Sequence, residues 1–170
     1  MRILFITDNY PPESNAPAIR TYEHLTEWKK NEDVEISVIT CFPNFPSGKI
    51  YEGYKNQLLF IDNNNGIKIY RVWSYMAQNS GFYKRILDFS SFALVASIIG
   101  MFIKTDIIIA TSPQFFTTWS ACFLSKIKKI PWIFELRDLW PESISSLNLI
   151  KNKIVLKWLE KIEIFLYKDC

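Results

Sequence analysis

Histidine and cysteine, which often supply metal ligands and catalytic nucleophiles, are scarce in this sequence. One histidine, His24, and three cysteines stand among 170 residues. The single histidine argues against a His-based triad or a histidine-rich metal site, and we interpret it as a packing or surface residue. Cys41, Cys122 and Cys170 lie far apart without a CxxC spacing, so neither a zinc site nor a disulfide framework is indicated. We expect a reducing, cytoplasmic setting.

Phosphate-binding fingerprints and a strong charge bias are also absent. The sequence has five glycines and contains no G-x-G-x-x-G or GK[ST] motif, which argues against dinucleotide-binding and P-loop proteins. A receiver domain has a pair of acidic residues after its first strand, but Asp8 is followed by Asn9 and Tyr10. The sequence therefore argues against a receiver domain. The net charge of +3 is too small to indicate a nucleic-acid partner.

No apolar run reaches the roughly 20 residues that cross a bilayer. The longest uncharged run, residues 89–103, has Lys84, Arg85 and Lys104 on its flanks. We predict a buried core helix there, with an interfacial helix beside anionic lipid as the alternative. The apolar run 3–6 is too short for a signal peptide and is typical of a first strand.

The apolar pattern alternates between short and helical segments. Runs at 3–7, 34–40, 67–73, 106–110 and 132–134 predict strands, and the continuously apolar first, fourth and fifth runs suit strands covered on both faces. Residues 67–72 alternate and belong nearer an edge. Helical spacing marks residues 19–28, 82–103, 114–128 and 153–168. The order predicts one α/β domain over residues 1–170, a Rossmann-like, doubly wound parallel sheet.

Two connections and the last helix add detail. Residues 63–66 predict a turn, and residues 41–54 predict a structured loop over the sheet edge. The last helix carries lysines around an apolar stripe of Ile154, Trp158, Ile162 and Phe165, which favours a core helix over membrane-surface contact. It runs almost to the last residue without a capping signal, so we expect that a larger protein would continue beyond it.

Charged residues follow the last predicted strand. Residues 134–143 read FELRDLWPES, and ligands of open α/β sheets bind beyond the carboxyl ends of strands. Arg137 could clamp a phosphate, whereas Asp138 or Glu142 could accept a hydrogen bond or a proton from a sugar hydroxyl. The alternative is an Arg137 ion pair that only stiffens the loop.

The loop after the first strand is a second candidate. Backbone N–H groups around Ser14, Asn15 and Ala16, followed by Arg20 in the first turns of a helix, suit a phosphate. The alternative is a helix cap at Asn15 or Ala16, with Arg20 in solvent.

A third candidate follows the fourth strand. Thr111, Ser112 and Gln114 would lie at the same edge of the sheet, where hydroxyl and amide groups suit a polyol. The alternative is plain capping by Ser112 with Pro113 at the first helical position.

Five blocks together resemble a known family. They are DNYPPE at 8–13, NAPAIRTYEH at 15–24, TCFPNFP at 40–46, ATSPQFF at 110–116 and FELRDLWPES at 134–143. In this order they resemble the N-terminal half of a bacterial family 4 glycosyltransferase over nearly the whole chain. The resemblance is to members that handle amino-deoxyhexoses such as N-acetylfucosamine in O-antigen and capsule synthesis.

The resemblance implies the N-terminal half of a GT-B fold, retention of configuration and no obligatory metal or cofactor. It implies a nucleotide sugar as donor, held mainly by a C-terminal domain that is absent here and would exist in cis or as a separate chain. The implied acceptor is a polyprenyl-diphosphate-linked saccharide, which places the protein on the cytoplasmic face of the inner membrane. Arg137 and Asp138 match the family's Arg-Asp pair, and Glu142 lies in the same loop. Residues 14–18 match its glycine-rich loop but contain no glycine.

The resemblance leads us to expect the acceptor-binding half of a transferase that is inactive as an isolated chain. A truncated, non-catalytic module that binds lipid-linked sugar or a partner chain is one alternative. A flavodoxin-like protein that binds nucleotide or phosphate is another, supported by the first-strand loop alone.

Overall fold

We analysed a computed structural model, which describes residues 1–76, 81–112, 115–137 and 153–170. The strands are β1 (Arg2–Ile6), β2 (Glu35–Cys41), β3 (Leu59–Asn64), β4 (Ile67–Val72), β5 (Ile107–Thr111) and β6 (Trp132–Glu135). The helices are α1 (Ala16–Lys29), α2 (Phe82–Phe102), α3 (Phe115–Lys128) and α5 (Lys153–Asp169).

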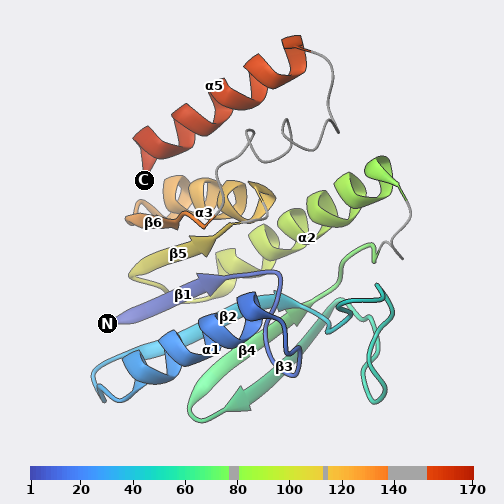
Figure 1. Cartoon of the computed structure of the whole chain (residues 1–170). Helices are drawn as coiled ribbons and strands as arrows, with labels where there is room; N and C mark the ends of the chain where they lie inside the picture. The colour runs from blue at the N-terminus through green and yellow to red at the C-terminus, as the bar shows by residue number, and fades with distance from the viewer. Residues whose placement is uncertain (77–80, 113–114, 138–152) are drawn as a thin grey trace.

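The strands form one sheet in the order β3-β4-β2-β1-β5-β6 (Figure 1). All neighbours pair in parallel except β3 and β4, which are antiparallel. The chain runs from β1 to β2 and then through the antiparallel pair β3 and β4 at one edge of the sheet. It returns to place β5 on the other side of β1. The fold is therefore the Rossmann-like, doubly wound α/β sheet that the pattern predicts, and its strand order reverses between β1 and β5.

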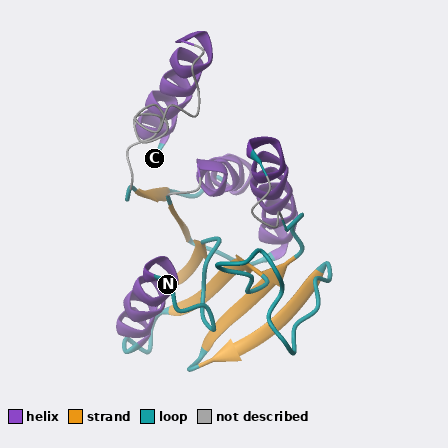
Figure 2. Cartoon of the chain, turned by 45° about the vertical axis from the view of Figure 1, so that its right-hand side comes forward, coloured by secondary structure: helices purple, strands orange, loops and turns teal. Residues whose placement is uncertain are grey.

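Helices cover both faces of the sheet, α1 on one side and α2 with α3 on the other (Figure 2). In β1, Ile3 and Phe5 belong to the core under α1, and Leu4 and Ile6 to the core under α2 and α3. A strand buried on both faces needs a continuously apolar run, which explains why the first run predicted a central strand.

The predicted strands agree with the structure to within a residue at most ends, but the prediction of five strands was wrong. β3 was missed because LFIDNN has neither strict alternation nor a continuous apolar run. It is an outer strand that pairs with β4 alone. The turn predicted before Ile67 is confirmed: Asn65 and Gly66 have φ angles of 52° and 77°, and they join β3 to β4.

Helix α2 is buried along one face only, so the prediction of a buried core helix is half wrong. Phe92 and Ala96 are fully buried, whereas Leu94 and Ile98 are 63% and 44% exposed. By length and composition the stretch Tyr83–Phe102 could cross a membrane, and 22% of it is buried against the rest of the described molecule. Helices of this kind also occur in the cores of soluble proteins.

Helix α5 lies against α3 and β6 through its last turns. Leu166 is buried, and the Asp169 carboxylate accepts from Trp132 Nε1 and pairs with Lys126 at 3.0 Å. Of the predicted apolar stripe, Ile162 packs on the core, while Trp158 and Phe165 are 64% and 50% exposed. The side chain of Ile154 lies outside the described residues.

Candidate functional site

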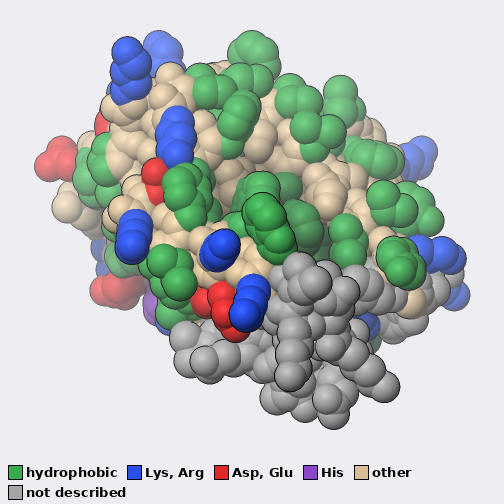
Figure 3. Space-filling view, turned by 90° about the horizontal axis from the view of Figure 1, so that it is seen from above, with side chains coloured by type: hydrophobic (Ala, Val, Ile, Leu, Met, Phe, Trp, Pro, Cys, Tyr) green, Lys and Arg blue, Asp and Glu red, His purple; other side chains and the backbone are tan. Residues whose placement is uncertain are grey.

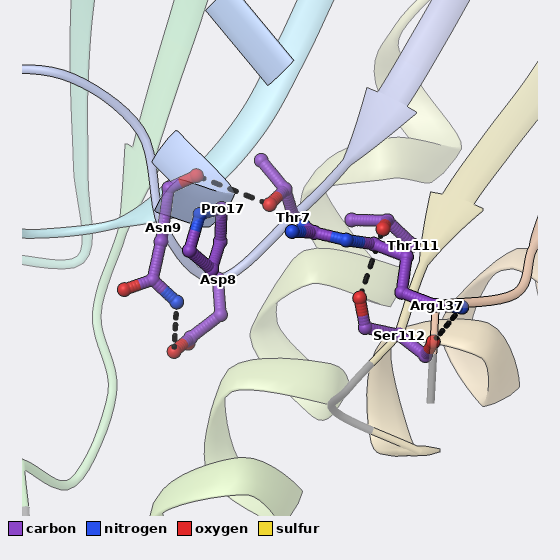
Figure 4. A pocket seen from close by; sticks show the side chains of 7 residues that line it. All are labelled: Thr7, Asp8, Asn9, Pro17, Thr111, Ser112 and Arg137. Carbon is purple, nitrogen blue, oxygen red and sulfur yellow. Dashed lines mark hydrogen bonds between the residues drawn. The ribbon is translucent and has the colours of Figure 1, made fainter. Parts of the chain in front are cut away.

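A small hollow lies where the strand order reverses, beyond the carboxyl ends of β1 and β5 (Figure 4). Its volume is about 10 Å³, enough for roughly one water molecule or one polar atom of a ligand. Seven residues line it: Thr7, Asp8, Asn9, Pro17, Thr111, Ser112 and Arg137. We call it the switch-point hollow. In open α/β sheets this is the place where ligands bind.

The loop from β1 to α1 is fixed by side-chain hydrogen bonds. Thr7 Oγ1 donates to Asn9 O at 3.1 Å, and Asn15 Nδ2 donates to Asn9 Oδ1 at 2.6 Å. Asn15 Oδ1 accepts from the Ala18 N–H at 3.0 Å and so caps α1. The cap considered for Asn15 is therefore present, and it holds this wall of the hollow in place.

The opposite wall comes from β5 and β6. Thr111 Oγ1 donates to Ser112 O at 2.9 Å, and Ser112 Oγ accepts from the Arg137 N–H at 2.7 Å. Ser112 thus ties the end of β5 to the residue that supplies the hollow's positive charge. The cap considered for Ser112 involves Pro113 and Gln114, which lie outside the described residues.

Arg137 extends from the end of β6 toward Thr7 (Figure 4). Its Nη1 atom is buried and has no hydrogen-bond partner among the residues that the structure describes, and no ion pair of Arg137 occurs there either. The alternative of a loop-stiffening ion pair therefore has no support in the described part of the chain. Arg137 as a whole is half-buried, and a guanidinium nitrogen in this position can bind an anionic oxygen, since charge-assisted hydrogen bonds are the strong ones.

Arg20 does not line the switch-point hollow. Its Nη2 atom lies 2.9 Å from Glu135 Oε1, and His24 Nδ1 lies 3.9 Å from the same oxygen. The ion pair joins α1 to the end of β6, and the Arg20 side chain is 48% exposed. His24 stacks on Trp28, as expected of a packing residue. In this structure Arg20 therefore pairs with Glu135, and neither residue lines the hollow.

The other predicted site residues are placed differently. Ser14 and Ala16 are exposed, and neither contributes to the lining of the hollow. Gln114, Asp138 and Glu142 lie outside the described residues. Thr7, Asp8, Asn9 and Pro17 were not among the predicted site residues, although their position after the first strand of a doubly wound sheet is a signal for them.

Two buried ionisable residues, one in the loop after β1 and one bonded to it, were also missed. Glu13 is 3% exposed, and its Oε1 accepts from the N–H groups of Asn44 and Phe45 at 2.8 and 2.9 Å. Burial raises the pKa of this carboxyl, and the hydrogen bonds partly oppose that shift. Glu13 thereby fixes the loop at residues 41–54, which is structured as predicted.

Arg71, in β4, is 1% exposed and donates to the carbonyl oxygens of Pro11 and Cys41. Arg71 lies on the same face of the sheet as Ile67 and Ile69. A charged residue at a position of the apolar face was therefore the sequence signal that could have predicted a buried arginine.

Metal binding has no support in the described ranges. Within them, no group of three or more His, Cys, Asp or Glu side chains lies close enough together to hold an ion.

Comparison with known proteins gives one distant relative and no matching family model. Over 153 residues the chain is 26% identical to an Escherichia coli (strain K12) protein described as "Putative colanic acid biosynthesis glycosyl transferase WcaI". The match covers 88% of this chain and 37% of that protein. The C-terminal domain of a hydrogenase from Pyrococcus furiosus matches over 79% of this chain and 90% of its own, at 10% identity and a TM-score of 0.48. At the level of the sequence, the chain is distantly similar to part of this glycosyl transferase.

Proposed function

We propose that this chain is the acceptor-binding half of a retaining glycosyltransferase, which moves a sugar from a nucleotide sugar to a polyprenyl-diphosphate-linked saccharide in cell-surface polysaccharide synthesis. The observation that carries the proposal is Arg137, with Nη1 buried and unpartnered in the switch-point hollow. The distant relation to a colanic acid glycosyl transferase supports the same class of reaction. The nucleotide sugar would be held mainly by a second domain, in the same chain or in another.

The reaction requires a group that stabilises the negative charge that develops on the leaving diphosphate. In the transfer, the bond between C1 of the sugar and the nucleoside diphosphate breaks, and the diphosphate leaves with the electron pair. A bond from an acceptor hydroxyl oxygen to C1 forms, and the hydroxyl proton passes to a base. Arg137 would stabilise the diphosphate oxygens, which is the kind of preorganised electrostatic contact that lowers such barriers. Asp8 is the carboxylate in the described lining, and Asp138 and Glu142 follow Arg137 in sequence.

A membrane surface would bring the enzyme to a lipid-linked acceptor. The outward stripes of α2 and α3 expose large apolar side chains, which we call the apolar helix face: Leu87, Leu94, Ile98, Met101, Phe102, Trp119, Phe123 and Ile127. Among them Phe102 is 80% and Leu94 63% exposed. In the space-filling view from above, hydrophobic side chains lie over much of the surface, with Lys, Arg, Asp and Glu side chains among and around them (Figure 3).

The charges around the apolar helix face favour anionic lipid. Lys84, Arg85 and Lys104 are exposed, and Asp88 is the acidic residue within α2 and α3. The opposite face of α2 is packed on the core through Phe92 and Ala96, so we propose that the helix lies along the membrane surface. We therefore propose that the protein is peripheral on the cytoplasmic face of the inner membrane.

Co-sedimentation with vesicles tests the membrane contact. The pair Lys84→Glu and Arg85→Glu should lower binding to vesicles that contain phosphatidylglycerol, because each basic residue near an anionic surface contributes about 1 kcal/mol. The control is Lys30→Glu with Lys55→Glu, the same change of charge at exposed positions outside α2 and α3. Equal binding of both double variants would contradict the proposal.

The transfer itself is tested in membranes from the source cells. Label from nucleotide sugars should enter the lipid-linked saccharide fraction in membranes with the native gene. Deletion of the gene should abolish one such incorporation, and a plasmid copy should restore it. Unchanged incorporation of every nucleotide sugar after deletion would contradict the proposed function.

A further inference from the structure

A second and larger hollow lies at the carboxyl end of β4. Its volume is about 300 Å³, within the size range of small-molecule sites. The loop after β2 contributes Lys49 and Ile50, the segment before β3 contributes Asn56, and the residues after β4 contribute Trp73, Ser74 and Tyr75. We call it the β4 hollow. It has no residue in common with the switch-point hollow.

Two polar atoms of its lining residues lack partners. Ser74 is 1% exposed, and its Oγ is buried without a hydrogen-bond partner in the described part of the chain. Asn56 Oδ1 is in the same situation, while Asn56 Nδ2 donates to Ser74 O at 2.8 Å. Each unsatisfied buried group costs about 1–3 kcal/mol, and native proteins leave few of them. The two side chains are therefore suited to a partner from outside the chain.

The chemistry of these atoms restricts the partner. Asn56 Oδ1 only accepts hydrogen bonds, so an ionised phosphate or carboxylate cannot satisfy it. Ser74 Oγ both donates and accepts. A ligand that carries hydroxyl groups satisfies both residues, because each hydroxyl can donate to one and accept from the other.

Two aromatic residues of the same lining add an apolar surface. Trp73 and Tyr75 are 38% and 41% exposed, on either side of Ser74 in sequence. Aromatic side chains provide a large apolar surface next to a polar group. A sugar ring combines the two requirements, since it has apolar C–H faces and a rim of hydroxyl groups.

We propose that the β4 hollow is a saccharide-binding site, in which Ser74 and Asn56 bind hydroxyl groups and Trp73 and Tyr75 contact the apolar ring face. That the saccharide is part of the acceptor rests on the proposed function. Strands β4, β2 and β1 are successive neighbours, so β4 lies about 10 Å from β1 at the same edge of the sheet. An extended saccharide could reach from the β4 hollow to the switch-point hollow.

Binding of neutral sugars to the ¹⁵N-labelled chain tests the site. The probes are N-acetylglucosamine, galactose and L-fucose at millimolar concentration, observed by ¹H–¹⁵N correlation NMR. At least one should shift the Trp73 indole signal, identified with Trp73→Phe, and the backbone signals of Ser74 and Tyr75. Ser74→Ala should weaken that binding about fivefold, the loss of one hydrogen bond, without loss of stability, because its hydroxyl has no partner to lose.

Ser120→Ala is the matched control. Ser120 is also 1% exposed, but its Oγ donates to Ala93 O at 2.9 Å. This variant should lose stability and keep sugar binding. The proposal is overturned if no probe binds, if Ser74→Ala binds as well as the native chain, or if uridine or inorganic pyrophosphate shifts the same signals at lower concentration than any sugar. This experiment measures binding and does not depend on transfer. If the chain binds sugar but the membrane assay shows no transfer, the saccharide site is supported and only the proposed function is contradicted.

Discussion

Ser112, directly after β5, accepts a hydrogen bond of 2.7 Å from the backbone N–H of Arg137, two residues beyond β6. The contact joins two neighbouring strand ends across 25 residues of sequence. It fixes the point from which the Arg137 side chain enters the switch-point hollow. In the proposed function, Ser112 would be a positioning residue, and Arg137 would be the group that meets the ligand.

Replacing Ser112 should separate positioning from stability. Ser112→Ala removes an acceptor from the Arg137 N–H and should cost about 1 kcal/mol of stability. Ser120→Ala removes a buried hydroxyl that donates to the carbonyl oxygens of Ala93 and Phe116, and it should cost a similar amount. Both variants should lower transfer in proportion to the folded protein that is lost. Only Ser112→Ala should also lower the transfer per folded molecule. Equal transfer per folded molecule in the two variants would contradict the role of Ser112.

The ion pair between Arg20 and Glu135 should contribute little to stability. The Arg20 side chain is 48% exposed, and exposed pairs are typically worth 0 to about 1 kcal/mol. Arg20→Ala and Glu135→Gln should each unfold in urea within about 1 kcal/mol of the native chain. If Arg20 also binds phosphate, only Arg20→Ala should weaken binding of inorganic pyrophosphate by calorimetry. Pyrophosphate binding that is unchanged in Arg20→Ala would remove Arg20 from the site.

Glu13 should make stability depend on pH. Burial raises the pKa of its carboxyl above the usual 4.5, so the folded state binds this proton more tightly than the unfolded state does. The resulting stabilisation is fully present below pH 4.5 and is lost as the pH rises through the folded pKa. Glu13→Gln keeps an oxygen for Asn44 and Phe45 and does not ionise.

The measurement is the free energy of urea unfolding between acidic and neutral pH. The native chain should lose stability relative to Glu13→Gln as the pH rises. Glu13→Ala should be less stable than both throughout, because the N–H groups of Asn44 and Phe45 lose their acceptor, at about 1 kcal/mol each. Parallel pH profiles for the native chain and Glu13→Gln would contradict the assignment.

Gly100 should gain no stability from a larger side chain, despite its place inside a helix. A Cβ there would lie 2.5 Å from Leu124 Cδ1 and 3.5 Å from Ile39 Cδ1, and both residues are fully buried. Alanine would gain about 1 kcal/mol of helix propensity, but overpacking typically costs 1–3 kcal/mol. Gly100→Ala should therefore not stabilise the chain. In a Leu124→Ala background the clash is absent and the same substitution should be stabilising; a gain of stability in both backgrounds would refute the packing argument.

Strand positions could be predicted because burial on two faces imposes continuous apolar runs, as in Ile3 to Ile6. Strand β3 could not, because Asp62, Asn63 and Asn64 occupy an outer strand whose place depends on backbone pairing with β4. The uncharged run indicated the length of α2. It did not indicate that only one face of the helix is covered.

The sequence indicated where in the fold the candidate site would lie, but not which residues would contact one another there. Arg137 and Ser112 followed from strand ends, since parallel strands deliver their carboxyl ends to one edge. The pairing of Arg20 with Glu135 joins residues 115 positions apart, which no local pattern encodes. The β4 hollow was missed for a similar reason: Asn56 and Ser74 meet only because β3 and β4 form a hairpin between them.

Replacement of Arg137 tests the central claim most directly. Source cells that lack the gene would receive plasmid copies with Arg137, Arg137→Lys or Arg137→Ala, at equal protein levels by immunoblot. We expect Arg137→Ala to lower incorporation of labelled sugar into the lipid-linked saccharide by about 100-fold, the usual loss when one group that stabilises transition-state charge is removed. Arg137→Lys should retain part of the activity, because it keeps the charge without the guanidinium geometry. Full incorporation with Arg137→Ala would contradict the account.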